Sequence, residues 1–155
     1  QAWAIERMIE NQLSWVSSYF RFLDPANFAK GPGRWFDQAP EHVRDDLRKG
    51  LLEAVATNVR AAGVGRHLRE EVVWLGSLSL RSLDELLEDK AYLMRDSHPV
   101  GVDATAFAML AAIMTPFFDS PLRQEAERYP RLVDYVSRMM AQFYPAHPWN
   151  LRQAA

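Results

Sequence analysis

The chain has 155 residues, 48% of them hydrophobic and 25% charged, which is the composition of one globular domain. Its formal net charge is −2, and its 18 basic residues are scattered among 20 acidic ones, so neither a nucleic-acid surface nor a polybasic membrane patch is expected. The absence of cysteine excludes a disulfide framework, a zinc–thiolate site and a cysteine nucleophile, and it is consistent with a cytoplasmic protein.

Helical spacing of apolar residues marks the first part of the chain. It predicts a helix over residues 3–23. Residues 24–40 are rich in proline and glycine and predict a loop, which Trp35 and its aromatic neighbour should pin to the core. Pro40 then opens a second helix, because proline is favoured at a first-turn position. The stripe that this helix is expected to bury consists of Val43, Leu47, Leu51, Val55 and Val59.

The second half of the chain predicts four more helices. A long one is expected over residues 66–89, and a second from residue 102 to 114 is apolar almost all round, which is typical of a helix sealed inside a bundle. A short helix over 121–128 and a last one over 130–144 follow. The predicted fold is all-α, with about six helices around a central buried helix in a domain of residues 1–145, followed by a tail over 146–155.

The segment before the central helix carries a resemblance to a known family. Residues 90–116 read KAYLMRDSHPVGVDATAFAMLAAIMTP, and they resemble the C-terminal domain of glutathione transferases, in which Pro99 and Asp103 match the run before the central helix. Residues 65–71 and 129–135 are similar to the branch that includes metaxin and the failed-axon-connections proteins. The resemblance covers residues 3–145.

Asp103 is expected to be a structural helix cap. The family places a serine or threonine where this chain has Val100, and that hydroxyl would form one half of a capping box. Val100 cannot accept a hydrogen bond, so only the Asp103 half remains, with its carboxylate on the backbone N–H of Val100.

The resemblance implies a function that needs a second domain. In the family a thioredoxin-like domain, which we expect to precede this chain and which the chain lacks, binds the cosubstrate glutathione for attack on an electrophile. The helical domain then lines the electrophile site and supports a homodimer. No catalytic residue and no metal site can be assigned here. The polar face of the first helix is the predicted electrophile-site wall, formed by Trp3, Arg7, Glu10, Asn11 and Ser14.

Several of these candidate residues also have a purely structural interpretation. Arg7 and Glu10 lie three residues apart and can pair with each other on a solvated helix face, and Trp15 has the spacing of a core residue. His67 near Glu70 and Glu71 predicts a surface ion pair with one of these carboxylates, since no histidine has metal-ligand spacing.

Two further functions remain as alternatives. The metaxin-like branch suggests a non-catalytic interaction or assembly scaffold, whose exposed first helix contacts a partner or a second copy. A free-standing domain with its own ligand pocket gains no support from the central helix, which carries no convergent polar groups. Trp149 is expected either in a disordered tail or tucked against the body.

Overall fold

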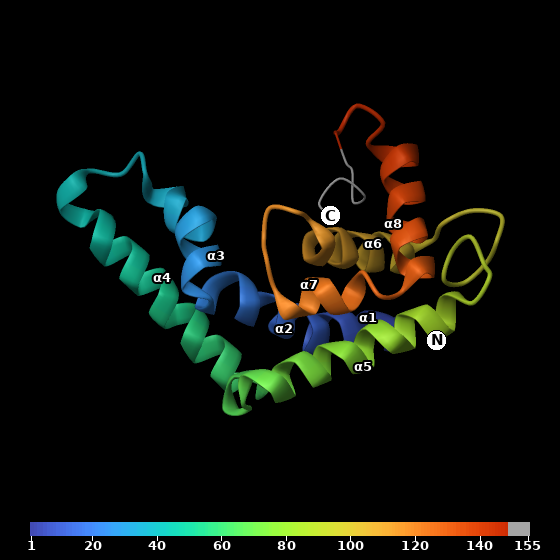
Figure 1. Cartoon of the computed structure of the whole chain (residues 1–155), viewed down its shortest axis with the longest axis horizontal. Coiled ribbons are helices and arrows are strands. Elements are labelled where there is room, and N and C mark those ends of the chain that lie inside the picture. The colour runs from blue at the N-terminus through green and yellow to red at the C-terminus, as the bar shows by residue number, and fades with distance from the viewer. Residues whose placement is uncertain (149–155) are drawn as a thin grey trace.

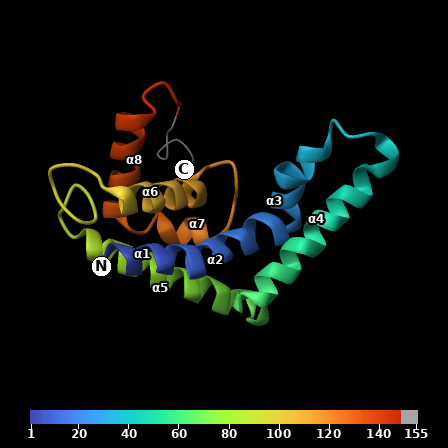
Figure 2. The same ribbon diagram turned by 180° about the vertical axis from the view of Figure 1, so that it is seen from behind.

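The computed structural model describes residues 1–148, and every regular element in that range is a helix. The all-α prediction is therefore confirmed, and no strand occurs within the described residues. Figures 1 and 2 show two parts, a body built on α1, α5, α6, α7 and α8 and an arm formed by α3 and α4. Trp149, which was expected either in a disordered tail or packed against the body, lies outside the described residues.

The first helix is one continuous rod made of four consecutive segments that alternate between α-helical and π-helical geometry. It comprises α1 (Ala2–Met8), a π-helical turn η1 (Ile9–Leu13), α2 (Ser14–Ser18) and a second π-helical turn η2 (Tyr19–Leu23). The rod ends at Asp24, whose backbone is extended as expected before a proline. The predicted bounds of 3–23 are thus confirmed to within a residue.

The prediction of a loop over residues 24–40 is wrong. The segment contains α3 (Pro25–Lys30) and a 3₁₀ helix, η3 (Pro32–Phe36). The helix forms because Asp24 acts as an N-cap, accepting hydrogen bonds from the amides of Ala26 and Asn27, ahead of a first-turn proline. Trp35 is not pinned to the core either: its side chain is 64% exposed and meets the ring of Phe22 edge to face.

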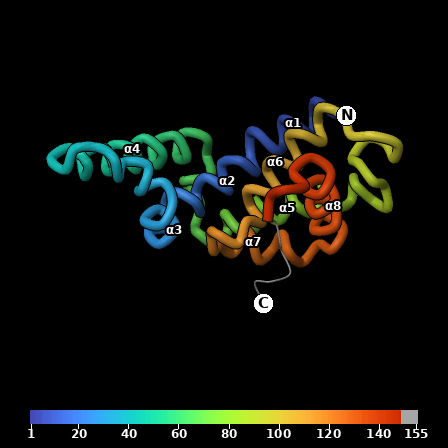
Figure 3. The backbone as a smooth tube through the Cα atoms, turned by 90° about the horizontal axis from the view of Figure 1, so that it is seen from above, coloured from blue at the N-terminus to red at the C-terminus, as the bar shows by residue number. Residues whose placement is uncertain are grey.

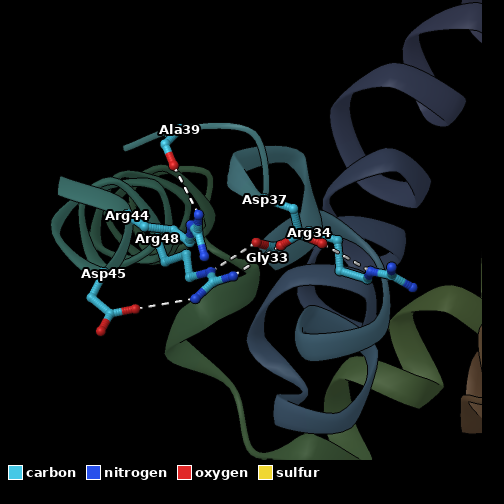
Figure 4. Close-up of polar contacts among 7 residues, drawn as sticks. All are labelled: Gly33, Arg34, Asp37, Ala39, Arg44, Asp45 and Arg48. Atoms are coloured by element: carbon cyan, nitrogen blue, oxygen red, sulfur yellow. Dashed lines mark hydrogen bonds and ion pairs between the residues drawn. The ribbon is translucent and has the colours of Figure 1, made fainter. Parts of the chain in front are cut away.

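The arm is completed by α4 (Glu41–Ala61), and a set of arginine contacts holds it together (Figure 4). Arg48 on α4 donates to the carbonyl oxygen of Gly33 and to the carboxylates of Asp37 and Asp45. The hydrogen bond from Arg34, and then that from Arg48, lower the pKa of Asp37. These contacts fasten η3 onto α4 by polar bonds, with little apolar burial.

The buried stripe predicted for α4 is confirmed in part. Val59 is buried and Val43, Leu51 and Val55 are half-buried, but the side chain of Leu47 is 42% exposed. The apolar spacing correctly predicted a helix, but α4 projects from the body and packs mainly on η2, α2, η3 and η4 (Figure 1). No second layer of helices covers its other side.

A sharp turn returns the chain from the arm to the body. Gly63 takes a left-handed φ of 100°, which favours glycine, and a short 3₁₀ helix, η4 (Val64–Arg66), follows. The next helix, α5, runs from Arg69 to Leu87, within the predicted 66–89. It lies beside the first helix (Figures 1 and 2), and the Gln12 side chain donates to the Leu75 carbonyl oxygen across that contact.

The body is built around α6 (Gly101–Met114), with α7 (Pro121–Ala126) and α8 (Pro130–Phe143). α6 packs against α1, α7 and α8, and Figure 3 shows it between α1 and α8. The prediction of a central buried helix is confirmed, with one correction. Ala104 and Ala108 are exposed, so α6 is not sealed on every side.

Candidate functional site

Asp103 is completely buried at the start of α6 and has three hydrogen-bonding partners. Its carboxylate accepts from the backbone N–H of Val100 at 2.9 Å, as predicted, and from that of Leu93 at 2.8 Å. The hydroxyl of Tyr135 on α8 lies 3.2 Å from the same carboxylate and 3.0 Å from the Asp103 carbonyl oxygen. Asp103 therefore ties α6, α8 and the preceding loop together.

The surroundings of Tyr135 hold its hydroxyl in the protonated form. Burial and then the negative charge of Asp103 raise the pKa of Tyr135 above its usual range. A protonated Tyr135 is a hydrogen-bond donor to the carboxylate, which suits a structural link between helices.

An apolar groove opens beside this network, between α6 and α8. Its volume is about 900 Å³, within the range of about 300–1,000 Å³ that is typical of small-ligand pockets. One wall is the exposed alanine stripe of α6, and the other comes from the last turns of α8 and the residues after it. The lining from α8 onward consists of Met139, Met140, Phe143, Tyr144 and His147.

The chemistry of the groove favours contact with an apolar group. Phe107 and Tyr144 bring their rings to 6.0 Å between centroids, and His147 is the one lining side chain with an imidazole. Ala104 and Ala108 leave room at the wall, since alanine carries no more than a methyl group. The groove can hold an apolar surface by contact and by exclusion of water, and it presents no cysteine, serine or carboxylate as a nucleophile.

The predicted electrophile-site wall lies on the first helix and does not line this groove. Trp3 is 72% exposed, and Arg7 pairs with Glu10 at 2.5 Å, as the simpler interpretation predicted. The Ser14 hydroxyl donates to the backbone oxygen of Glu10, and Asn11 is exposed. The five residues share one helix face, and their role in binding stays a prediction.

The remaining candidate residues have structural surroundings. His67 lies 3.4 Å from Glu71, which confirms the predicted surface contact. Trp15 is partly buried and packs against the core. Within residues 1–148 no three histidine, aspartate or glutamate side chains come together as metal ligands.

The sequence pattern does not mark three buried polar residues, Asn27, Ser79 and Asp84. Asn27 on α3 donates to the backbone oxygens of Phe20 and Asp119, and it accepts from the amide of Asp119. These bonds join the root of the arm to the loop between α6 and α7. The proline- and glycine-rich pattern of residues 24–40 predicts a loop, and nothing in it marks Asn27 as buried.

The sequence of these helices matches the model of a known domain family. The family model described as glutathione S-transferase, C-terminal domain, matches residues 76–139, which include most of α5, all of α6 and α7 and much of α8. Residues 76–139 are similar to the glutathione S-transferase C-terminal domain. Its Asp103 cap and central α6 are the features that the resemblance predicted.

This glutathione-transferase-like chain is also similar to a curated relative. It is 30% identical to Failed axon connections from Drosophila melanogaster over 156 aligned residues, which cover 93% of this chain. The chain spans 37% of the relative's length. No solved structure matches the chain.

A helix needs about 20 predominantly apolar residues to cross a bilayer. Among residues 1–148, no helix is both long enough and apolar enough to do so.

Proposed function

We propose that this chain is the helical half of a glutathione-transferase-like protein, in which glutathione is conjugated to an electrophile. In that reaction the glutathione sulfur bonds to the electrophilic carbon as a leaving group departs. The described residues contain no candidate nucleophile in the groove, so the thiolate is activated on the thioredoxin-like domain, and this chain contributes apolar contact. The proposal places the protein in the cytoplasm.

The groove between α6 and α8 is the single observation that carries this proposal. The groove is lined mostly by apolar side chains and is open to solvent at Ala104, Ala108 and Phe143, so we expect a partner surface to cover these residues. We assign that role to the thioredoxin-like domain of the whole protein.

Glutathione binding tests the proposal directly. The whole protein is expected to bind immobilised glutathione and to conjugate it to a chloronitrobenzene, whereas the 155-residue chain does neither. Binding by the chain alone would contradict this division of roles.

Substitutions in the groove test how the halves meet. Ala108→Arg puts a charge on an exposed position of the groove wall, and it should separate the thermal unfolding of the whole protein into two transitions. Ala56→Arg, at an exposed position of α4 outside the groove, is the matched control and should leave one transition. A single transition in both variants would remove the groove from the domain contact.

The exposed arm supports a second candidate, a non-catalytic interaction scaffold. α4 leaves most of its apolar residues incompletely covered, which is typical of a helix that packs on a partner. A whole protein that does not bind glutathione, but whose self-association depends on α4, would favour the scaffold. Both candidates include a homodimer.

A further inference from the structure

α4 carries an apolar face that no other part of residues 1–148 covers. After the partly buried Val43, its positions are all exposed, and no atom approaches within 4 Å of a Cβ built on Gly50. The spacing along the helix alternates between four and three residues, which is the heptad spacing of a coiled-coil seam. The face consists of Val43, Leu47, Gly50, Ala54, Thr57 and Ala61.

This face is distinct from the side of α4 that packs within the arm. Arg44 and Arg48 point to η3 and the turn after it, and Val55 packs against the core. The heptad face lies next to that side on the same helix, and α4 stands away from the body in all three views (Figures 1, 2 and 3). A second helix can therefore approach along its whole length.

We propose that a second copy of this chain occupies the face, with the two α4 helices antiparallel. In this register Leu47 lies against Thr57 of the second copy, and Gly50 lies against Ala54 of the second copy. The small residues at the centre let the two helix axes come close, and Leu47 fills the space beside Thr57. This inference specifies the homodimer of the proposed function and does not depend on glutathione binding.

Charge complementarity favours this occupant and this direction. In the antiparallel register Asp46 lies beside Arg60 of the second copy, and the symmetric pair repeats the contact. Neither side chain has an ion pair within residues 1–148. At the centre the two Glu53 side chains face each other, and Lys49 of each chain, 3.9 Å from its own Glu53, offsets the two like charges.

A parallel pair lacks these contacts. It would place Asp46 beside Leu51 and Glu53 beside Asn58, so no ion pair would form across the seam. It would also bring both bodies to the same end of the pair, because α4 leads through η4 directly into α5. The antiparallel pair keeps the two bodies at opposite ends.

Cysteine pairing tests the register, because the chain has no cysteine of its own. A mixture of Gly50→Cys and Ala54→Cys chains should form a disulfide-linked dimer on mild oxidation, and each variant alone should form far less. As the control, Ala56→Cys, which lies outside the seam, replaces either of the two variants in the mixture and should give little cross-linking. Efficient cross-linking of Gly50→Cys alone, or none in the mixture, would overturn the antiparallel register.

A charge exchange tests the pairing without oxidation. In sedimentation velocity, Asp46→Arg alone and Arg60→Asp alone should each weaken the dimer at least tenfold, and the double variant should regain it. If none of these substitutions changes the dimer affinity, the dimer does not form through α4, although the proposed homodimer would still stand. A protein that is monomeric at all concentrations would contradict both the α4 seam and the proposed homodimer. The glutathione-binding experiment is independent of these two outcomes.

Discussion

α6 and α4 both carry an apolar pattern that predicts a helix, but their surroundings differ. α6 is enclosed by α1, α7 and α8, and its only polar core residue, Asp103, has a partner for each of its carboxylate oxygens. α4 packs on one side only, through arginine contacts to η3 as much as through apolar contact. The comparison shows that an apolar pattern predicts which face needs covering, whereas the neighbouring elements decide whether the same chain covers it.

The largest effect is expected at the buried cap. Asp103→Ala removes the acceptor for the amides of Val100 and Leu93 and for the hydroxyl of Tyr135, so the free energy of unfolding should fall by about 3 kcal/mol or more. Urea unfolding of the 155-residue chain measures this loss. Asp45→Ala, an exposed acid on the arm, is the control and should change stability little. Equal stability of the two variants would refute the contrast between the regions.

Tyr135→Phe should cost about 1–2 kcal/mol at neutral pH, because one donor to Asp103 is lost. It should also change the response to alkali. The raised pKa of Tyr135 keeps it protonated in the folded state, while in the unfolded chain it ionises near pH 10. The stability that depends on its protonation is therefore complete below about pH 10 and is lost as the pH rises further.

Unfolding measured on both sides of that pH tests the assignment. The original chain should lose more stability on going to alkaline pH than Tyr135→Phe does, since the variant has no hydroxyl to ionise at that position. Parallel losses in the two proteins would show that Tyr135 does not cause the alkaline destabilisation.

Adding one methyl group at a glycine in each region, Gly76 in the body and Gly50 in the arm, tests how tightly each region is packed. A Cβ built on Gly76 of α5 lies 2.5 Å from Leu122 and 3.0 Å from Val16, both buried, so Gly76→Ala should destabilise the fold by about 1–2 kcal/mol. Gly50 has open space, and Gly50→Ala should stabilise it by up to about 1 kcal/mol through helix propensity. Thermal melts of both variants check the signs, and the same sign at both positions would contradict the difference in packing.

The smallest effect on global stability is expected at the arginine contacts of the arm. Arg48→Met removes the bonds to Gly33, Asp37 and Asp45 but keeps much of the side chain's apolar length. Limited proteolysis should become faster near η3, while cleavage in α6 stays unchanged. Equal acceleration in both regions would indicate that the arm and the body unfold as one unit.

The sequence predicted most of the fold because the helices of the body satisfy their patterns within the chain. The Asp103 cap was predictable from its spacing to Val100, although Tyr135 and Leu93 as further partners were not, since they come from distant segments. α3 was missed because its N-cap, Asp24, was read only as the end of the preceding helix.

The candidate site was less predictable than the fold. The alanines of α6 were read as evidence of complete burial, because composition does not show that α8 ends where it leaves Ala104 and Ala108 uncovered. The small residues at 104, 108 and 111 were the available signal for a groove. The first-helix residues Arg7 and Glu10 were predictable as an ion pair, and no contact within the chain tests their predicted role.

Hydrogen–deuterium exchange of the 155-residue chain beside the whole protein tests the central claim, that the groove between α6 and α8 is covered by another domain. The account predicts that exchange slows in the whole protein at the start of α6 and at the end of α8, around Gly101 and Phe143, while the interior of α5 stays the same. Identical exchange at the groove in both proteins would contradict it.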